Sequence, residues 1–288
     1  MRLMRFTRFS KQSSALLSAA RRALSVGVLV LGPMLMLGFL IAAGVDEARD
    51  SVRGEDELLV AAASDLRFAF AELGERFESE SGVGVTFNFG STGLLTQQIE
   101  NGAPFDVFFS ANRAYIDRLV EGGFAADEPW AYAIGYLAVV VPGGEPLPAP
   151  EALSEDRFEA LAIANPAHAP YGMAAEQALE SLGLKSALEE RLVYGENVLD
   201  ALRLVETGNA DVGLVALAFL DAAEGVDGEK LSPELHEPIE QTAVTIEGAA
   251  NLEAARRFLE FVGGEVGREV LERYRFGTPD AGGDEYGR

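Results

Sequence analysis

Short apolar runs alternate with segments of helical period along most of the chain. The run "LLVAAA" (58–63) is followed by a segment whose large apolar residues recur at helical spacing: Leu66, Phe70, Leu73 and Phe77. The same order recurs at "VTFNF" (85–89), at "FDVFFSA" (105–111) and in a second block that begins near "GYLAVVVPGG" (135–144). Strand followed by helix throughout predicts parallel sheets in an α/β layer fold.

A late strand and two helices complete the pattern. The alternating segment "QTAVTIEGA" (241–249) follows the second block and leads into two amphipathic helices. A return strand of this kind predicts two α/β lobes joined by two crossings of the chain. The expected division is a linker over 46–56, a first lobe over 57–135 and 242–276, a second lobe over 136–241, and a disordered tail over 277–288.

The N-terminus has the pattern of an export segment. Six basic residues and no acids precede an uncharged run from Ala23 to Val45. The length of this run lies between that of a long signal peptide and that of a membrane span of about 20 residues. "AAG" (42–44) offers small residues for cleavage before Val45, and the basic flank keeps the N-terminus inside. We therefore expect an extracytoplasmic body, either released or anchored to the inner membrane by residues 23–45.

Charge and composition exclude several classes of function. Without the first 45 residues the chain carries 17 basic and 46 acidic residues, a net charge of −29. Such a body is a poor partner for nucleic acid or anionic lipid. No cysteine is present, which excludes disulfides and thiolate metal sites, and the two histidines, His168 and His236, are too few for a histidine-rich metal centre.

Small and polar residues gather at four turns, each of which leaves an apolar run and enters a helical segment. These turns are "AASDL" around Ser64, "GSTG" around Thr92, "AHAPYG" around Tyr171 and "YGENV" around Val198. Ligands of open α/β sheets collect at such strand ends. The hydroxyls have two interpretations: helix capping, which is the more common role of Ser and Thr at a helix start, and binding of an anion together with backbone amides.

Single residues in these turns also keep alternative roles open. Asp65 is an awkward neighbour for an anion, and we expect its carboxylate to turn outward. Tyr171 fits a core aromatic equally well. No "GxSxG", "GxxxxGK[ST]" or "HExxH" motif occurs in the sequence, so the patterns of a hydrolase elbow, a nucleotide-phosphate loop and a zinc protease are missing. An exported hydrolase that uses Ser64 or Thr92 with an acidic base is the alternative from another functional class.

Five segments in order resemble one known family. They are "VAAASDL", "FNFGSTGLLTQQIENGAPFDVFFSAN", "ANPAHAPYGMAAEQAL", "NVLDALRLVETGNADVGLVAL" and "FLEFVGGEVGREVLERYRF". Together they look like the periplasmic molybdate-binding proteins of ABC transporters, over about residues 58–276. The resemblance implies a type II periplasmic-binding-protein fold, with two α/β lobes joined by two hinge strands. It also implies a monomeric receptor without catalytic activity or cofactor, which delivers its ligand to an ABC permease in the membrane.

The family's site can be carried over by motif. The resemblance implies that Ser64, Thr92 and the amide of Val198 bind a tetrahedral oxyanion, so that molybdenum is held only as molybdate, or tungsten as tungstate. Many members have a ligand tyrosine where Ala216 stands here, and Tyr171 is expected to supply the phenol from the opposite turn. Asp65, Ser91 and Asn197 lie beside these positions as further candidates. A sulfate receptor is the nearest rival within the binding class.

Overall fold

The structure is a computed structural model, and it describes residues 57–279. Residues 1–56 and 280–288, which include the expected export segment, the linker and most of the expected tail, lie outside the described residues. Within residues 57–279, no helix is long and apolar enough to cross a membrane.

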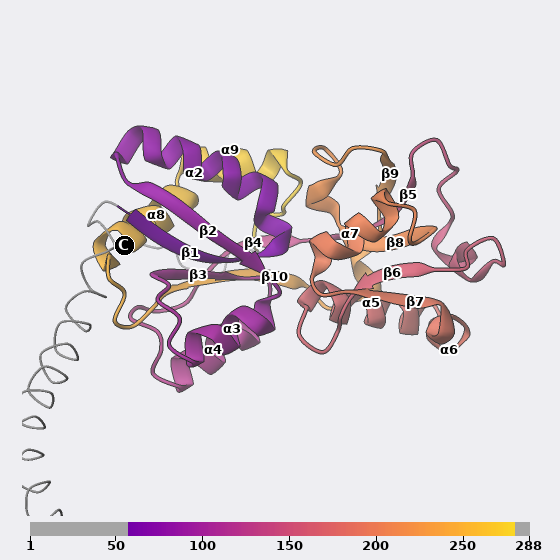
Figure 1. Ribbon diagram of the computed structural model, residues 1–288, viewed down its shortest axis with the longest axis horizontal. Helices are drawn as coiled ribbons and strands as arrows, with labels where there is room; N and C mark the ends of the chain where they lie inside the picture. Colours follow the sequence, from indigo (N-terminus) through magenta and orange to yellow (C-terminus); the bar gives the residue numbers. More distant parts are fainter. Residues whose placement is uncertain (1–56, 280–288) are drawn as a thin grey trace, which may run out of the picture. The chain divides into compact units, whose positions relative to one another are not determined.

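Two five-stranded mixed sheets form the framework (Figure 1). The first has the order β2-β1-β3-β10-β4 and contains β1 (Glu57–Ala63), β2 (Gly84–Gly90), β3 (Val107–Ser110), β4 (Trp130–Gly135) and β10 (Ile239–Thr245). The second has the order β7-β6-β8-β5-β9 and contains β5 (Leu137–Pro142), β6 (Leu161–Ala164), β7 (Leu192–Gly195), β8 (Val212–Ala216) and β9 (Val226–Lys230).

Helices cover the sheets of both lobes. The first lobe carries α2 (Arg67–Ser81), α3 (Thr92–Glu100), α4 (Arg113–Glu121), α8 (Leu252–Gly263) and α9 (Glu265–Arg273), with α3 and α4 on the face opposite α2, α8 and α9 (Figure 1). The second carries α5 (Pro170–Ser181), α6 (Lys185–Leu188) and α7 (Val198–Glu206). Short 3₁₀ turns are η1 (Ser64–Leu66), η2 (Pro150–Ser154), η3 (Glu189–Arg191), η4 (Leu217–Phe219) and η5 (Pro233–Leu235).

The chain passes between the sheets twice. β4 ends in the first sheet at Gly135 and β5 begins in the second at Leu137, so the first crossing is a single residue, Tyr136. β10 then returns from the second sheet to the first. This confirms the expected fold class. We propose the lobe limits given above with one adjustment, because β10 already begins at Ile239 rather than after residue 241.

The prediction of parallel sheets was wrong in part. β1 pairs in parallel with β2 and β3, and β6 with β7 and β8, as the helical crossovers between them require. β10 is antiparallel to β3 and β4, and β5 is antiparallel to β8 and β9. These strands enter their sheets from the crossings and not through a helix, which frees their direction.

The first residue of the predicted tail is part of the folded structure. Gly277 forms two 2.8 Å backbone hydrogen bonds with Ile134 and so is paired rather than disordered. A side chain at this position would overlap the Tyr136 ring, so a glycine is needed for the close approach.

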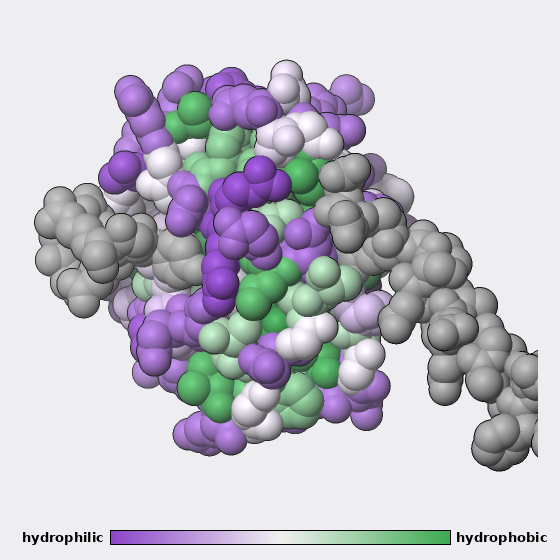
Figure 2. Space-filling view, turned by 90° about the vertical axis from the view of Figure 1, so that its left-hand side faces the viewer, coloured by the Kyte–Doolittle hydropathy of each residue, from purple (hydrophilic) through white to green (hydrophobic). Residues whose placement is uncertain are grey.

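Burial explains the local structure. The predicted apolar face of the first helical segment, Leu66, Phe70, Leu73 and Phe77, is buried, and Phe70 packs edge-to-face on Phe109 with ring centroids 4.7 Å apart. Gly82 ends α2 in the left-handed conformation (φ 72°) that glycine adopts without strain. On the face shown in Figure 2, a band of hydrophilic residues runs down the middle, and apolar residues lie beside it in smaller groups. Large aromatic side chains therefore pack inside the lobes and support the sheets and helices that carry the four turns.

Candidate functional site

A small pocket lies between the lobes and is lined by both. Its walls contain all seven residues singled out in the sequence: Ser64, Asp65, Ser91, Thr92, Tyr171, Asn197 and Val198. Ala63, Gly90, Ala111, Ala169 and Pro170 complete the lining. The empty space, open mouth included, is about 190 Å³. A space this small favours a small ion over a larger organic ligand.

Three hydrogen-bond donors of this wall have no acceptor within the described residues. The Ser64 hydroxyl makes no hydrogen bond to any of them. The Thr92 hydroxyl accepts from the amide of Ala111 at 3.2 Å, which leaves its own proton free to donate. Val198 is the first residue of α7, a position where the helix offers its N–H no acceptor. Two hydroxyls and one amide therefore face a common space from three elements.

Helix capping by Ser64 and Ser91, the more common role, was the wrong interpretation. Ser91 occupies the N-cap position of α3, but its side chain makes no capping hydrogen bond. Ser64 begins η1 without a side-chain cap. True side-chain caps occur at Asn112, Asn197 and Asn251, where amide oxygens accept from the helix starts.

Asn197 acts on the site indirectly, by orienting the backbone amide of the next residue, Val198. Its Oδ1 accepts from the amides of Leu199 and Asp200 at 3.0 and 3.1 Å, and its Nδ2 donates to Asp200 Oδ2 at 2.9 Å. Both the oxygen and the nitrogen of the side chain are thus engaged at the start of α7. Its contribution is to fix the direction of the Val198 amide.

Ser91 is used in a contact between the lobes. Its hydroxyl donates to the carbonyl oxygen of His168 at 2.6 Å, and the same oxygen accepts from the Gly93 amide at 2.9 Å. Nδ1 of His168 lies 2.7 Å from Ser91 Oγ. Because Ser91 has already donated its only proton, Nδ1 must be the donor in this second bond. We call the contact of Ser91 and Gly93 with His168 the clasp. No local sequence pattern indicates it, because the partners come from different lobes.

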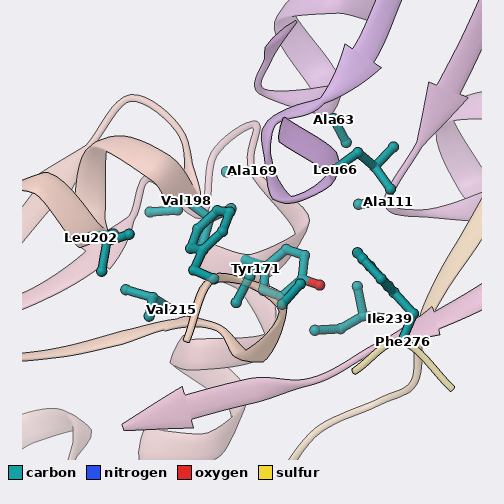
Figure 3. Packing of buried hydrophobic residues seen from close by; sticks show 14 of the residues in the cluster. Ala63, Leu66, Ala111, Ala169, Tyr171, Val198, Leu202, Val215, Ile239 and Phe276 are labelled. Carbon is teal, nitrogen blue, oxygen red and sulfur yellow. The ribbon is translucent and has the colours of Figure 1, made fainter. Parts of the chain in front are cut away.

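Tyr171 crosses from α5 towards the hinge strands. Figure 3 shows its ring between the two lobes, with Val198 on one side and Ala63 and Ala111 on the other, and its hydroxyl directed towards Ile239 of β10. A Cβ at Gly135 would overlap this hydroxyl, so the glycine at the end of β4 makes room for the phenol. Tyr171 is buried, and its hydroxyl makes no hydrogen bond within the described residues.

Asp65 does not turn outward as expected. The side chain is buried, and Oδ2 accepts a 2.7 Å hydrogen bond from Nε2 of Gln241 on β10, while Oδ1 has no partner within the described residues. Tyr132 contacts the same Gln241 through its hydroxyl at 3.5 Å. The distant amide of Gln241 holds the carboxyl inside, which sequence reasoning could not detect.

Burial determines the pKa values of Asp65 and Tyr171. Loss of water raises the pKa of the Asp65 carboxyl to about 7, against the opposing effect of nearby donors. The largest of these effects comes from the Tyr171 hydroxyl, which lies close to the carboxyl without the geometry of a full hydrogen bond. Burial, followed by the negative charge of Asp65, raises the pKa of the Tyr171 phenol well above its usual value. The pocket wall contains no lysine, arginine or histidine. Any anion held there is stabilised by neutral donors and helix starts rather than by a counter-charge.

Neither a phenol from β8 nor a bare metal ion is expected at the site. Ala216 ends β8, is buried and does not line the pocket, so β8 supplies no phenol to the site. Within residues 57–279, no cluster of three His, Asp or Glu side chains could hold a bare metal ion.

Comparisons with known proteins agree with this architecture. The family model of bacterial extracellular solute-binding proteins matches residues 58–277. The molybdate-binding protein ModA of Azotobacter vinelandii is 36% identical over 226 residues, which cover 77% of this chain and 90% of that protein. ModA of Rhodobacter capsulatus is 33% identical, over 77% and 88% of the two chains.

Solved structures show the same fold. The periplasmic molybdate-binding protein of Azotobacter vinelandii superposes with a TM-score of 0.71 and 31% identity, covering 77% of this chain and 100% of that one. The sulfate-binding protein SubI of Mycobacterium tuberculosis shares the fold at 15% identity and a TM-score of 0.66.

The mixed-sheet lobes with a small pocket between them define a two-lobed binding protein. This chain belongs to the family of bacterial extracellular solute-binding proteins. It is accordingly a solute-binding protein of transport and not an enzyme, which removes the exported hydrolase as an alternative.

The clasp can be tested by amide exchange. Ser91→Ala removes a side-chain bond between the lobes, and a hydrogen bond of this kind is worth about 1 kcal/mol. We expect the Gly93 amide, which donates across the lobes, to exchange about five to ten times faster. Ser181→Ala is the matched control, because Ser181 donates to Leu235 within the second lobe. Equal exchange of Gly93 in wild type and Ser91→Ala would show that the clasp does not hold the lobes together.

Asp65 also predicts a pH effect on stability. The pKa of Asp65 is about 7 in the folded state, whereas its ordinary value is 3.8, so between these two pH values the folded state binds more protons than the unfolded state. Its contribution to the free energy of unfolding is complete below about pH 4 and is lost as the pH rises through 7. Relative to wild type, Asp65→Asn should therefore gain stability with rising pH, by at most about 1.4 kcal/mol per unit.

Urea denaturation at several pH values between 4 and 8 measures this difference. Asp227→Asn, at an exposed carboxylate that accepts from the Gly144 amide, is the control for a general change of charge. Parallel curves for wild type and Asp65→Asn would contradict a raised pKa of Asp65.

Proposed function

We propose that this protein is an extracytoplasmic receptor that binds molybdate or tungstate in the pocket between its lobes. Ser64, Thr92 and the Val198 amide are the proposed donors to the oxyanion, and Tyr171 completes the set from the second lobe. Asp65, Ser91 and Asn197 shape the site without donating their own side chains directly. The observation that carries the proposal is that two hydroxyls and one helix-start amide have no acceptor among the described residues and converge on one small pocket without a basic side chain.

The chemistry of the donors supports a fully ionised oxyanion. Molybdate and tungstate remain dianions at neutral pH and offer only acceptors, so a wall of donors suits them. Charge-assisted hydrogen bonds contribute about 1.5–3 kcal/mol each, enough for a few to hold the ion in a water-poor site. Relatives named as molybdate-binding proteins support the same ligand.

We further propose that the receptor acts outside the cytoplasm as a monomer and delivers its ligand to an ABC permease. The basic and apolar N-terminal segment supports export, and its residues 23–45 either leave with a signal peptide or remain as an inner-membrane anchor. Two lobes joined by two crossings can hinge, and closure on the ion would give the permease a surface to recognise. The strongly acidic body makes nucleic acid an unsuitable partner.

Sulfate is the second candidate ligand. It is also a tetrahedral dianion without a proton at neutral pH, and a sulfate-binding protein shares the fold. Because sulfate is smaller than molybdate, the discrimination depends on pocket size and not on the type of donor.

Calorimetric titration of the mature protein with molybdate, tungstate, sulfate and phosphate tests the proposal. We expect tight binding of molybdate and tungstate, weaker binding of sulfate and little response to phosphate. Tight binding of sulfate or phosphate with no heat from molybdate would refute it.

Substitution of the donors tests the site itself. Ser64→Ala and Thr92→Ala each remove one charge-assisted hydrogen bond, so we expect molybdate affinity to fall about 10- to 100-fold in each. Thr207→Ala is the matched control, because its hydroxyl donates to Arg203 at the end of α7, on the exposed surface. Unchanged affinity in both pocket variants would place the ligand elsewhere.

A further inference from the structure

Asp65 is a buried acid in the wall of the site that is proposed to hold a dianion. The Asp65 carboxyl lines the pocket, is 1% exposed, and has one oxygen bonded to Gln241 and the other without a partner within the described residues. The hydroxyl of Tyr171 is also buried, forms no hydrogen bond of full geometry within the described residues, and lies near enough for the charge of this carboxyl to raise the pKa of the phenol. An ionised Asp65 and a bound dianion would repel each other strongly, because the buried surroundings contain little water to screen their charges.

The protonation state of Asp65 determines where the Tyr171 hydroxyl can donate its proton. A phenol has one proton to donate. If Asp65 is ionised, its free Oδ1 is the strongest acceptor near that proton, and the phenol then turns a lone pair towards the pocket. If Asp65 is protonated, the carboxyl can donate to the phenol oxygen, and the phenol proton is free to point at a ligand.

We propose that Asp65 binds a proton from the solvent when the oxyanion binds, so that the ligand is held by a donor chain from the Asp65 carboxyl through the Tyr171 hydroxyl. This inference rests on the proposed function and adds the regulation of that site by pH. One proton moves from water to Asp65 and no covalent bond to the ligand forms. The net charge added to the buried corner is thereby one unit less negative than the charge of the ion.

The groups that surround Asp65 support this choice of proton acceptor. Tyr171 of α5 and Tyr132 of β4 face it as neutral phenols, and Gln241 of β10 supplies an amide. β2 and η4 carry no charged residue. On α2, the guanidinium of Arg67 lies over the Phe89 ring, and on α7, Asp200 is paired with Arg203. No cation among these neighbours is directed at Asp65 to keep it ionised.

The pH range follows from the burial of the acid. The pKa of the Asp65 carboxyl is raised to about 7 by loss of water before any ligand is present, and a neighbouring dianion favours the neutral form still further. Binding is therefore strongest below pH 7, where the acid is already neutral. Above pH 7 the apparent affinity should fall by up to about tenfold per pH unit, because binding then requires the uptake of a proton and the proton concentration falls tenfold with each unit.

Calorimetry in buffers of different ionisation enthalpy measures the proton directly. Molybdate is titrated into the mature protein at pH 6 and at pH 8, in matched pairs of buffers. We expect uptake of nearly one proton per ion at pH 8 and about a tenth of a proton at pH 6, from the degree of ionisation of an acid with this pKa. Release of protons, or no proton exchange at pH 8, overturns the inference.

Asp65→Asn is the diagnostic variant. Asparagine can accept from Gln241 through Oδ1 and donate to Tyr171 through Nδ2, so it imitates the protonated acid. We expect it to bind molybdate at pH 8 about as tightly as wild type does at pH 6, without proton uptake. Asp227→Asn, an exposed carboxylate away from the pocket, should keep the wild-type uptake. Uptake that persists in Asp65→Asn assigns the proton to another group and overturns the inference.

The outcomes separate this inference from the proposed function. If no oxyanion binds at any pH, the proposed function fails and the inference fails with it. If molybdate binds with equal affinity and no proton uptake from pH 6 to 8, the receptor stands and the role of Asp65 does not. Should Asp65→Asn not fold, the proton count of the wild-type protein alone decides.

Discussion

Helix starts leave backbone N–H groups that their own helices cannot satisfy, and the site depends on this constraint. α3, α5 and α7 all begin at the pocket, together with the turn η1. Where a capping side chain accepts from such amides, as Asn197 does from Leu199 and Asp200, those amides are closed to ligands. The Val198 amide and the Thr92 hydroxyl have no such acceptor within the described residues and are left for a ligand in the pocket. A dianion is the ligand that such an arrangement binds without a counter-charge.

The two lobes turn these separate helix starts into one site. η1 and α3 belong to the first lobe, and α5 and α7 to the second, so neither lobe holds the whole set. On one side of the pocket, the clasp joins Ser91 and Gly93 to His168. Elsewhere, Phe68 packs edge-to-face on Phe219, and Arg275 forms an ion pair with Asp221. A ligand in the pocket therefore contacts both lobes at once, which suits the lobe closure proposed above for recognition by a permease.

Much of the fold and the position of the site could be predicted from the sequence, because both depend on local patterns. The helical spacing of Leu66, Phe70, Leu73 and Phe77 predicted a buried face correctly, and the four turns with small residues predicted which residues line the pocket. The roles within the pocket were less accessible. Asp65 is held inside by Gln241, 176 positions away, and Ser91 is engaged by His168, 77 positions away. No local pattern contains such partners, and the direction of β10 depended in the same way on where the chain re-enters the first sheet.

Diffraction from crystals of the mature protein grown with molybdate, recorded at the molybdenum absorption edge, tests the central claim most directly. The account predicts one strong anomalous peak between the lobes, with oxyanion oxygens at hydrogen-bond distance from the Ser64 and Thr92 hydroxyls and the Val198 amide, and no basic side chain in contact. A peak at another place on the molecule, or an ion in the pocket held by lysine or arginine, would contradict it.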